Sequence, residues 1–121
     1  MRIPGPDHPI AITPNPNRVR VVFNGRIVAE TTQALTLREA NYPPVQYIPR
    51  SDADMAMFSR TTHATHCPYK GDAAYFSLSA DGRVSENAVW TYEAPYPAVG
   101  EIKEFVAFYP RRVDRIEEVP R

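Results

Sequence analysis

The chain contains one cysteine, and the residues around it are the first whose types suggest chemistry. Cys67 lies in the segment THCPYKG, residues 65–71, where Pro68 holds it extended and begins a tight turn. Lys70 follows within this turn, and a cationic neighbour favours the thiolate, which is the nucleophilic form of cysteine. Cys67 and Lys70 are therefore candidate catalytic residues.

Two further residues are candidates for proton transfer beside this cysteine. His63 and Cys67 point to the same side of an extended strand, and the isolated acid Glu39 could pair with Lys70 or accept a proton. A mononuclear metal site made of His63, Cys67 and an acid is a weaker alternative, because four residues of strand separate the two Cα atoms by about 13 Å. Cys67 could also form the floor of a ligand pocket, or be a small buried hydrophobe, which is the usual role of a free cysteine.

A run of aromatic residues follows the cysteine turn on a predicted long hairpin. Asp81-Gly82 has the residues of a two-residue hairpin turn, and this turn sets Trp90 opposite Ala73 and Tyr92 opposite Gly71. One face of the hairpin then carries Tyr75, Trp90 and Tyr92, and the other carries Phe76, Leu78 and Val89.

The aromatic face has two interpretations. Small residues opposite large rings are typical of a packed core. The alternative is a recess in which a planar or cationic ligand stacks on the rings while nearby polar groups orient it. The candidate ligand-binding residues are Tyr47, Arg50, Tyr75, Trp90 and Tyr92, with Lys70 and Glu39 as polar anchors.

The elements that position these residues are mostly short strands. Five prolines in residues 1–17 predict an extended N-terminal arm, and residues 18–121 are expected to form a single β domain. Asn24-Gly25 predicts a hairpin turn, and Ser51 to Phe58 predicts one short helix. The remaining strands are predicted at residues 18–23, 27–29, 35–37, 45–48, 61–67, 105–109 and 113–119.

Composition limits the classes of partner and compartment. The 121 residues carry 14 basic and 14 acidic side chains, so no net field attracts a nucleic acid or an anionic membrane. One cysteine cannot form an intrachain disulfide or a four-thiolate zinc site, and this fits a reducing cytoplasm. Neither a metal nor another cofactor is expected.

The sequence resembles the uncharacterised family catalogued as domain of unknown function 427. The resemblance rests on residues 4–10 (PGPDHPI), Glu39 with residues 47–50 (YIPR), residues 65–71 with Ala74-Tyr75, residues 88–92 (AVWTY) with Pro95, and residues 107–109 (AFY). It implies a β-tent-like fold of two antiparallel sheets meeting at an angle, similar to methionine sulfoxide reductase B and the cereblon ligand-binding domain. The zinc-binding Cys-x-x-Cys pairs of many β-tent proteins are missing, as is a second cysteine for sulfoxide reduction. The family has also carried a nucleotidyltransferase-like label, but no acidic pair stands beside a glycine-rich phosphate loop.

Three functions remain open from the sequence. The favoured hypothesis is a small-molecule-binding module that uses the aromatic recess next to Cys67 and Lys70. The second is an enzyme with Cys67 as nucleophile or redox thiol. The third is an interaction domain that forms a homodimer through its proline-rich arm and an exposed strand edge.

Overall fold

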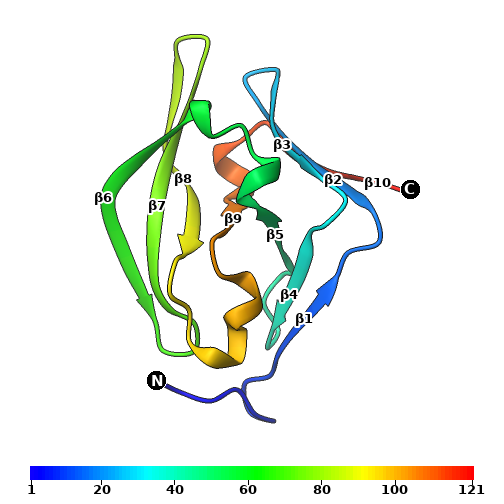
Figure 1. The fold of residues 1–121 in the computed structure, drawn as a ribbon, viewed down its shortest axis with the longest axis vertical. Coiled ribbons are helices and arrows are strands. Elements are labelled where there is room, and N and C mark those ends of the chain that lie inside the picture. Colours follow the sequence, from blue (N-terminus) through cyan, green and yellow to red (C-terminus); the bar gives the residue numbers. More distant parts are fainter.

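Ten strands form two antiparallel sheets in the computed structural model, which describes residues 1–121 (Figure 1). The strands are β1 (Ile10–Pro14), β2 (Arg18–Phe23), β3 (Arg26–Thr31), β4 (Leu35–Glu39), β5 (Val45–Pro49), β6 (Phe58–Cys67), β7 (Gly71–Ala80), β8 (Arg83–Tyr92), β9 (Phe105–Phe108) and β10 (Arg115–Val119). The larger sheet has the order β1-β4-β5-β9-β8-β7-β6, and the smaller has the order β10-β2-β3. This architecture confirms the expected mostly β fold with two antiparallel sheets.

Both predicted two-residue turns are present at the tips of hairpins. Asn24 and Gly25 have φ angles of 50° and 75° between β2 and β3, and Asp81 and Gly82 have φ angles of 52° and 83° between β7 and β8. Asn, Asp and Gly tolerate the left-handed region better than other residues, which is why these dipeptides turn the chain back on itself. In Figure 1 the two hairpin tips lie side by side at the top of the view.

The pairing of β7 with β8 differs from the prediction away from the turn. Ser79 pairs with Val84 as expected, but Tyr75 pairs with Trp90 and Ala73 pairs with Tyr92. Two additional residues of β8 are accommodated between Ser85 and Val89, where Asn87 has a φ of 51° and its N–H donates to Ser77 Oγ at 3.0 Å. The predicted pairs Trp90–Ala73 and Tyr92–Gly71 are therefore wrong, because turn chemistry alone does not reveal a bulge.

The shift by two residues leaves the two faces of the hairpin unchanged. Successive side chains of a strand alternate between faces, so an even shift returns each side chain to its original side. Phe76, Leu78 and Val89 accordingly contribute to one buried cluster, and Tyr75 and Tyr92 to another.

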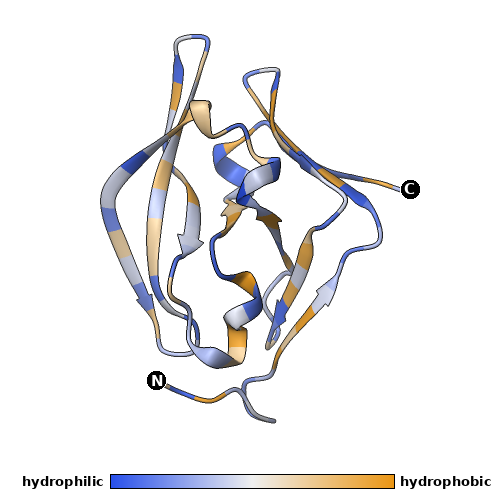
Figure 2. Ribbon diagram, viewed as in Figure 1, coloured by the Kyte–Doolittle hydropathy of each residue, from blue (hydrophilic) through white to orange (hydrophobic).

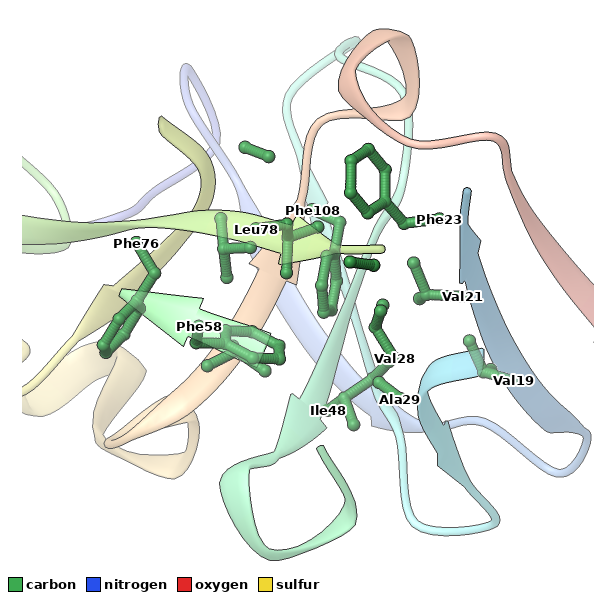
Figure 3. Close-up of a cluster of buried hydrophobic side chains, with 14 of the residues drawn as sticks. Val19, Val21, Phe23, Val28, Ala29, Ile48, Phe58, Phe76, Leu78 and Phe108 are labelled. Atoms are coloured by element: carbon green, nitrogen blue, oxygen red, sulfur yellow. The ribbon is translucent and has the colours of Figure 1, made fainter. Parts of the chain in front are cut away.

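The first cluster fills the space between the two sheets. The smaller sheet contributes five of its buried residues, Val19, Val21, Phe23, Val28 and Ala29. Figure 3 shows these side chains facing Ile48, Phe58, Phe76, Leu78 and Phe108 of the larger sheet. The strands are correspondingly mixed in hydropathy, with hydrophobic and hydrophilic positions following one another along the chain (Figure 2).

The second cluster lies on the opposite face of the larger sheet. Its buried members are Leu37, Tyr47, Ala73, Tyr75, Tyr92, Val99, Ile102 and Ala107. Val99 and Ile102 come from η3 (Pro97–Ile102), a 3₁₀ segment that covers part of this face. The larger sheet thus carries buried residues on both faces, and the second face carries the aromatic residues singled out from the sequence.

Helical structure is limited to short 3₁₀ segments. The helix expected from Ser51 onward is divided into η1 (Arg50–Asp52) and η2 (Met55–Met57), and η4 (Pro110–Arg112) follows β9. None of the helical segments has the length and apolarity needed to span a lipid bilayer.

The proline-rich N-terminal segment is extended, and β1 forms within it. Residues Ile10–Pro14 pair with β4 at the edge of the larger sheet. Before β1, the Arg2 N–H donates to the Pro68 carbonyl at 2.7 Å, so the chain also touches the turn that joins β6 to β7. Figure 1 shows this segment crossing the bottom of the view from the β6–β7 turn to β1. It therefore connects the two edges of the larger sheet.

Candidate functional site

A cavity of about 670 Å³ opens along the second face of the larger sheet and extends at one end to β10 of the smaller sheet. Seven of its 17 lining residues are aromatic, and three are charged. The lining includes Tyr42, Tyr47, Tyr75, Trp90, Tyr92 and Tyr109, together with Glu39, Lys70 and Arg115. Six residues selected from the sequence, Glu39, Tyr47, Lys70, Tyr75, Trp90 and Tyr92, line this one cavity.

Trp90 stands at the centre of the aromatic wall. Its Nε1–H donates to the Tyr47 hydroxyl at 3.2 Å, and the two rings are nearly perpendicular with centroids 6.3 Å apart. On the other side, the Tyr109 ring lies 4.5 Å from Trp90. The edge-to-face contact and the hydrogen bond together fix the orientation of the indole.

Tyr75 continues the wall toward the edge strand β6. Its hydroxyl lies 2.9 Å from Thr65 Oγ1 and 3.2 Å from the Tyr109 hydroxyl. Thr65 reaches this position because it pairs with Ala73 and shares a face with Tyr75. The Tyr75 hydroxyl is therefore already engaged on two sides by protein groups.

Glu39 ends β4 at the polar side of the cavity and contacts a lysine and a histidine from distant parts of the chain. Its Oε1 accepts a hydrogen bond from Lys70 Nζ, and its Oε2 lies 2.7 Å from His8 Nε2. Burial opposes ionisation of this carboxyl, but the hydrogen bonds from Lys70 and His8 outweigh burial and hold its pKa below the ordinary value. Glu39 is consequently a carboxylate at neutral pH.

Lys70 and His8 are both held by their surroundings. Lys70 is only 8% exposed, and its carbonyl accepts from the Tyr96 N–H at 2.9 Å. The His8 ring stacks on Tyr69 with centroids 4.0 Å apart and an angle of 3° between the planes. The β6–β7 turn and the N-terminal segment thus meet at Glu39.

Three phenol groups of the cavity, those of Tyr47, Tyr92 and Tyr109, have a raised pKa and are neutral over the physiological pH range. Burial is the main cause in each case: it raises the pKa of Tyr47 and Tyr92 far above the ordinary value. Burial, assisted by the hydrogen bond to Tyr75, raises the pKa of Tyr109 to about 12. Neutral phenols can donate hydrogen bonds to a ligand, which a phenolate cannot do.

A family model described as Domain of unknown function (DUF427) matches residues 11–119 of this chain. The chain belongs to the DUF427 family. No curated protein matches it. Every residue that lines the cavity falls within the matched range, whereas His8, which holds Glu39 from outside, precedes it.

Two residues predicted for the site lie outside the lining of the DUF427 cavity. Cys67 is half-buried at the end of β6, opposite Gly71. Arg50 donates to Thr91 Oγ1 at 3.1 Å, and its guanidinium lies 5.5 Å from the centre of the Phe76 ring, so it belongs to the face that meets the smaller sheet. Neither Cys67 nor Arg50 therefore lines the cavity.

His63, proposed from the sequence to move protons for Cys67, contacts the site only from its edge. It is exposed on β6, and its ring lies 4.4 Å from that of Tyr75. The ammonium of Lys70, proposed to activate Cys67, is bonded to Glu39 instead. The described chain also contains no group of three His, Cys, Asp or Glu side chains arranged to hold a metal ion.

Sequence reasoning missed several contributors to the DUF427 site, among them Tyr109, His8, residues 42–44 and Arg115. Tyr109 shares its side of the chain with Ala107 by the period of two, and this periodicity was the available signal. His8 and the segment Tyr42–Pro44 carry no periodic signal, because both lie outside regular strands. Their positions follow from the pairing of β1 with β4 and of β4 with β5.

Proposed function

We propose that this DUF427 domain binds a small planar molecule in the aromatic cavity. The observation that carries the proposal is the convergence of Tyr47, Tyr75, Trp90 and Tyr92 with Glu39 and Lys70 around one cavity. These side chains come from β4, β5, β7, β8 and the β6–β7 turn. An apolar cavity with a few convergent polar groups is the usual form of a small-molecule site, and about 670 Å³ is an ordinary volume for one.

The exposure of the aromatic residues favours an open site over a filled core. Tyr47 and Tyr75 are 1% and 4% exposed, but Trp90 is only partly buried and Tyr109 is 36% exposed. A closed core would bury the largest rings most completely. Here the rings extend from the sheet to the surface, which gives a flat molecule access to the indole and phenol faces.

The rings of the wall are pre-organised for stacking. The Trp90–Tyr47 and Tyr75–Tyr109 hydrogen bonds hold the side chains in place without a ligand. A ligand that stacks on such a wall loses less free energy to side-chain ordering than one that must arrange mobile rings.

Trp90 supplies the test, because it is the only tryptophan in the chain. The indole ¹H–¹⁵N signal and the intrinsic fluorescence should shift on titration with planar aromatic compounds, and the melting temperature should rise with ligand concentration. Trp90→Ala should abolish the rise in melting temperature. Val84→Ala, on the same strand at a position 64% exposed and away from the cavity, should retain it.

Two results would contradict the proposal. One is an indole signal and a melting temperature that stay constant across a broad set of planar compounds. The other is binding that survives unchanged in Trp90→Ala, which would place the ligand elsewhere on the molecule.

A further inference from the structure

The hydroxyl of Tyr92 is a hydrogen-bond donor without a partner in the protein. Tyr92 is 5% exposed and lines the cavity, yet its hydroxyl contacts no side-chain or backbone acceptor. The other two tyrosine hydroxyls of the central wall each have protein contacts: Tyr75 bonds to Thr65 and Tyr109, and Tyr47 accepts from Trp90. The Tyr92 hydroxyl is not one of the fully buried atoms that lack a partner, so solvent in the cavity reaches it. A donor that the protein leaves unused at a cavity is available to a ligand.

Two more groups at the same cavity have N–H or O–H donors that no protein group uses. The Tyr47 hydroxyl accepts from Trp90 Nε1 and donates to no protein group. The Lys70 ammonium has three N–H groups, and its side chain is hydrogen-bonded to Glu39 alone. Burial comes first in raising the pKa of Tyr92, and the neighbouring Tyr47, Cys67, Tyr75 and Glu39 add to it, which places Tyr92 within electrostatic range of the Glu39 end.

The carboxylate at the cavity is already engaged by the protein. Its Oε1 accepts from Lys70, and its Oε2 lies against His8 Nε2. Among the ionisable lining residues, Lys70 is paired with Glu39, and the exposed Arg115 of β10 is paired with Glu117. The polar side of the cavity therefore offers free donor hydrogens but no free carboxylate.

From this imbalance we infer that the ligand ends in an oxygen acceptor, a carbonyl or carboxylate group conjugated to its planar body. Tyr92, Tyr47 and Lys70 donate to that oxygen while the rings of Trp90 and Tyr109 contact the planar part. The inference rests on the proposed binding function and specifies the chemical class of its ligand.

A cationic ligand fits these groups less well, even though aromatic faces attract cations. An ammonium head could use a phenol hydroxyl as acceptor, but placing it beside Lys70 adds like-charge repulsion in a partly buried site. Displacing Lys70 from Glu39 would leave the lysine charge without its partner. Donor-rich recognition of an oxygen avoids both penalties.

Four probes with one planar body test the inference: naphthalene-2-carboxylate, 2-acetylnaphthalene, 2-methylnaphthalene and 2-naphthylmethylammonium. Dissociation constants come from calorimetry, and the Trp90 indole signal locates each probe. The carboxylate and the ketone should bind at least about tenfold more tightly than the methyl compound, since charge-assisted and neutral donors both contribute. The ammonium compound should bind most weakly.

Tyr92→Phe is the decisive variant, because the hydroxyl it removes has no partner in the protein and its loss leaves nothing unsatisfied. It should weaken the ketone about five- to tenfold and leave the methyl compound unchanged. Tyr75→Phe is the matched control, since it removes a hydroxyl from the same wall that is already bonded to Thr65 and Tyr109. It should leave the ratio of ketone to methyl affinity unchanged.

The outcomes separate the inference from the function on which it rests. If all four probes shift the Trp90 signal with equal affinity, or the ammonium compound binds most tightly, the proposed binding function stands and the oxygen-acceptor inference is wrong. If Tyr92→Phe weakens all four probes equally, the hydroxyl does not donate to the oxygen of the ligand, and the inference is likewise wrong. If no probe shifts the signal, both the proposed function and the inference are contradicted.

Discussion

The Lys70 ammonium and the Glu39 carboxylate form an ion pair at the polar side of the cavity, between residues 31 positions apart in the sequence. Their side chains are 10% and 13% exposed, so this pair lies in a far less polar environment than the surface ion pairs of the molecule. A pair of this kind constrains both the stability of the domain and the chemistry of its cavity.

Removing one member of the pair should destabilise the domain strongly. Lys70→Met leaves the Glu39 charge without its principal partner, and a broken buried pair costs about 3–5 kcal/mol in the free energy of unfolding. The double variant Lys70→Met/Glu39→Leu should recover most of that loss, since it removes both charges together. Urea denaturation measures the three proteins. A single variant that loses less than about 1 kcal/mol would show that solvent screens the pair.

The stability contributed by Glu39 should depend on pH in a defined direction. Its pKa is lower in the folded chain than the ordinary value of about 4.3, so its contribution is complete above that value and is lost as the pH falls through the folded pKa. The difference in unfolding free energy between the native protein and Glu39→Gln should therefore be largest near pH 7 and shrink toward pH 3. Glu30→Gln is the control on the exposed face of the smaller sheet, where the difference should stay small throughout. A Glu39→Gln difference that is constant with pH would contradict the assignment.

The contact of His8 with Glu39 should be separable from its stacking on Tyr69. His8→Phe keeps an aromatic ring on Tyr69 but loses the hydrogen bond to Glu39, whereas His8→Ala loses both. We expect His8→Phe to cost about 1 kcal/mol and His8→Ala to cost more, because ring stacking contributes independently. Thermal unfolding of the two variants checks the order. Equal losses would mean that stacking on Tyr69 adds nothing.

The bulge in β8 should depend on the residue at position 87. Asn87 has a φ of 51°, which asparagine and glycine adopt more readily than β-branched residues. Asn87→Val should lower the free energy of unfolding by about 1–3 kcal/mol, and Asn87→Gly should cost less. Chemical denaturation with the Trp90 signal as reporter measures both stability and the environment of the ring that the bulge aligns. A valine variant as stable as the glycine variant would contradict this reading of the strain.

Local chemistry was enough to predict the turns and the faces, but not the pairing. Asn24-Gly25 and Asp81-Gly82 form their turns because Asn, Asp and Gly tolerate positive φ angles. The prediction of which side chains share the aromatic face was correct, because successive side chains of a strand alternate between its two faces. The identity of the partner of Trp90 depends on a bulge stabilised by tertiary contacts, including the 2.7 Å hydrogen bond between Thr61 and Asn87.

The charged side of the site illustrates the limit of sequence reasoning. Glu39 and Lys70 were identified as possible partners from their residue types alone. His8 could not be placed there, because its approach depends on β1 pairing with β4 and on the N-terminal segment reaching the Pro68 carbonyl. Cys67 drew attention by its reactivity, yet the polar side of the cavity is built around the carboxylate of Glu39.

The bulge at Asn87 also determines which changes in length the long hairpin can accept. Two additional residues in β8 leave every ring beyond them on its own side of the sheet. One additional or missing residue, without a compensating change, would turn Trp90 and Tyr92 toward the smaller sheet and bring Val89 and Thr91 to the cavity. Insertions and deletions in β8 of related chains should therefore contain an even number of residues. Any other length change would turn the ligand-facing side chains away from the cavity.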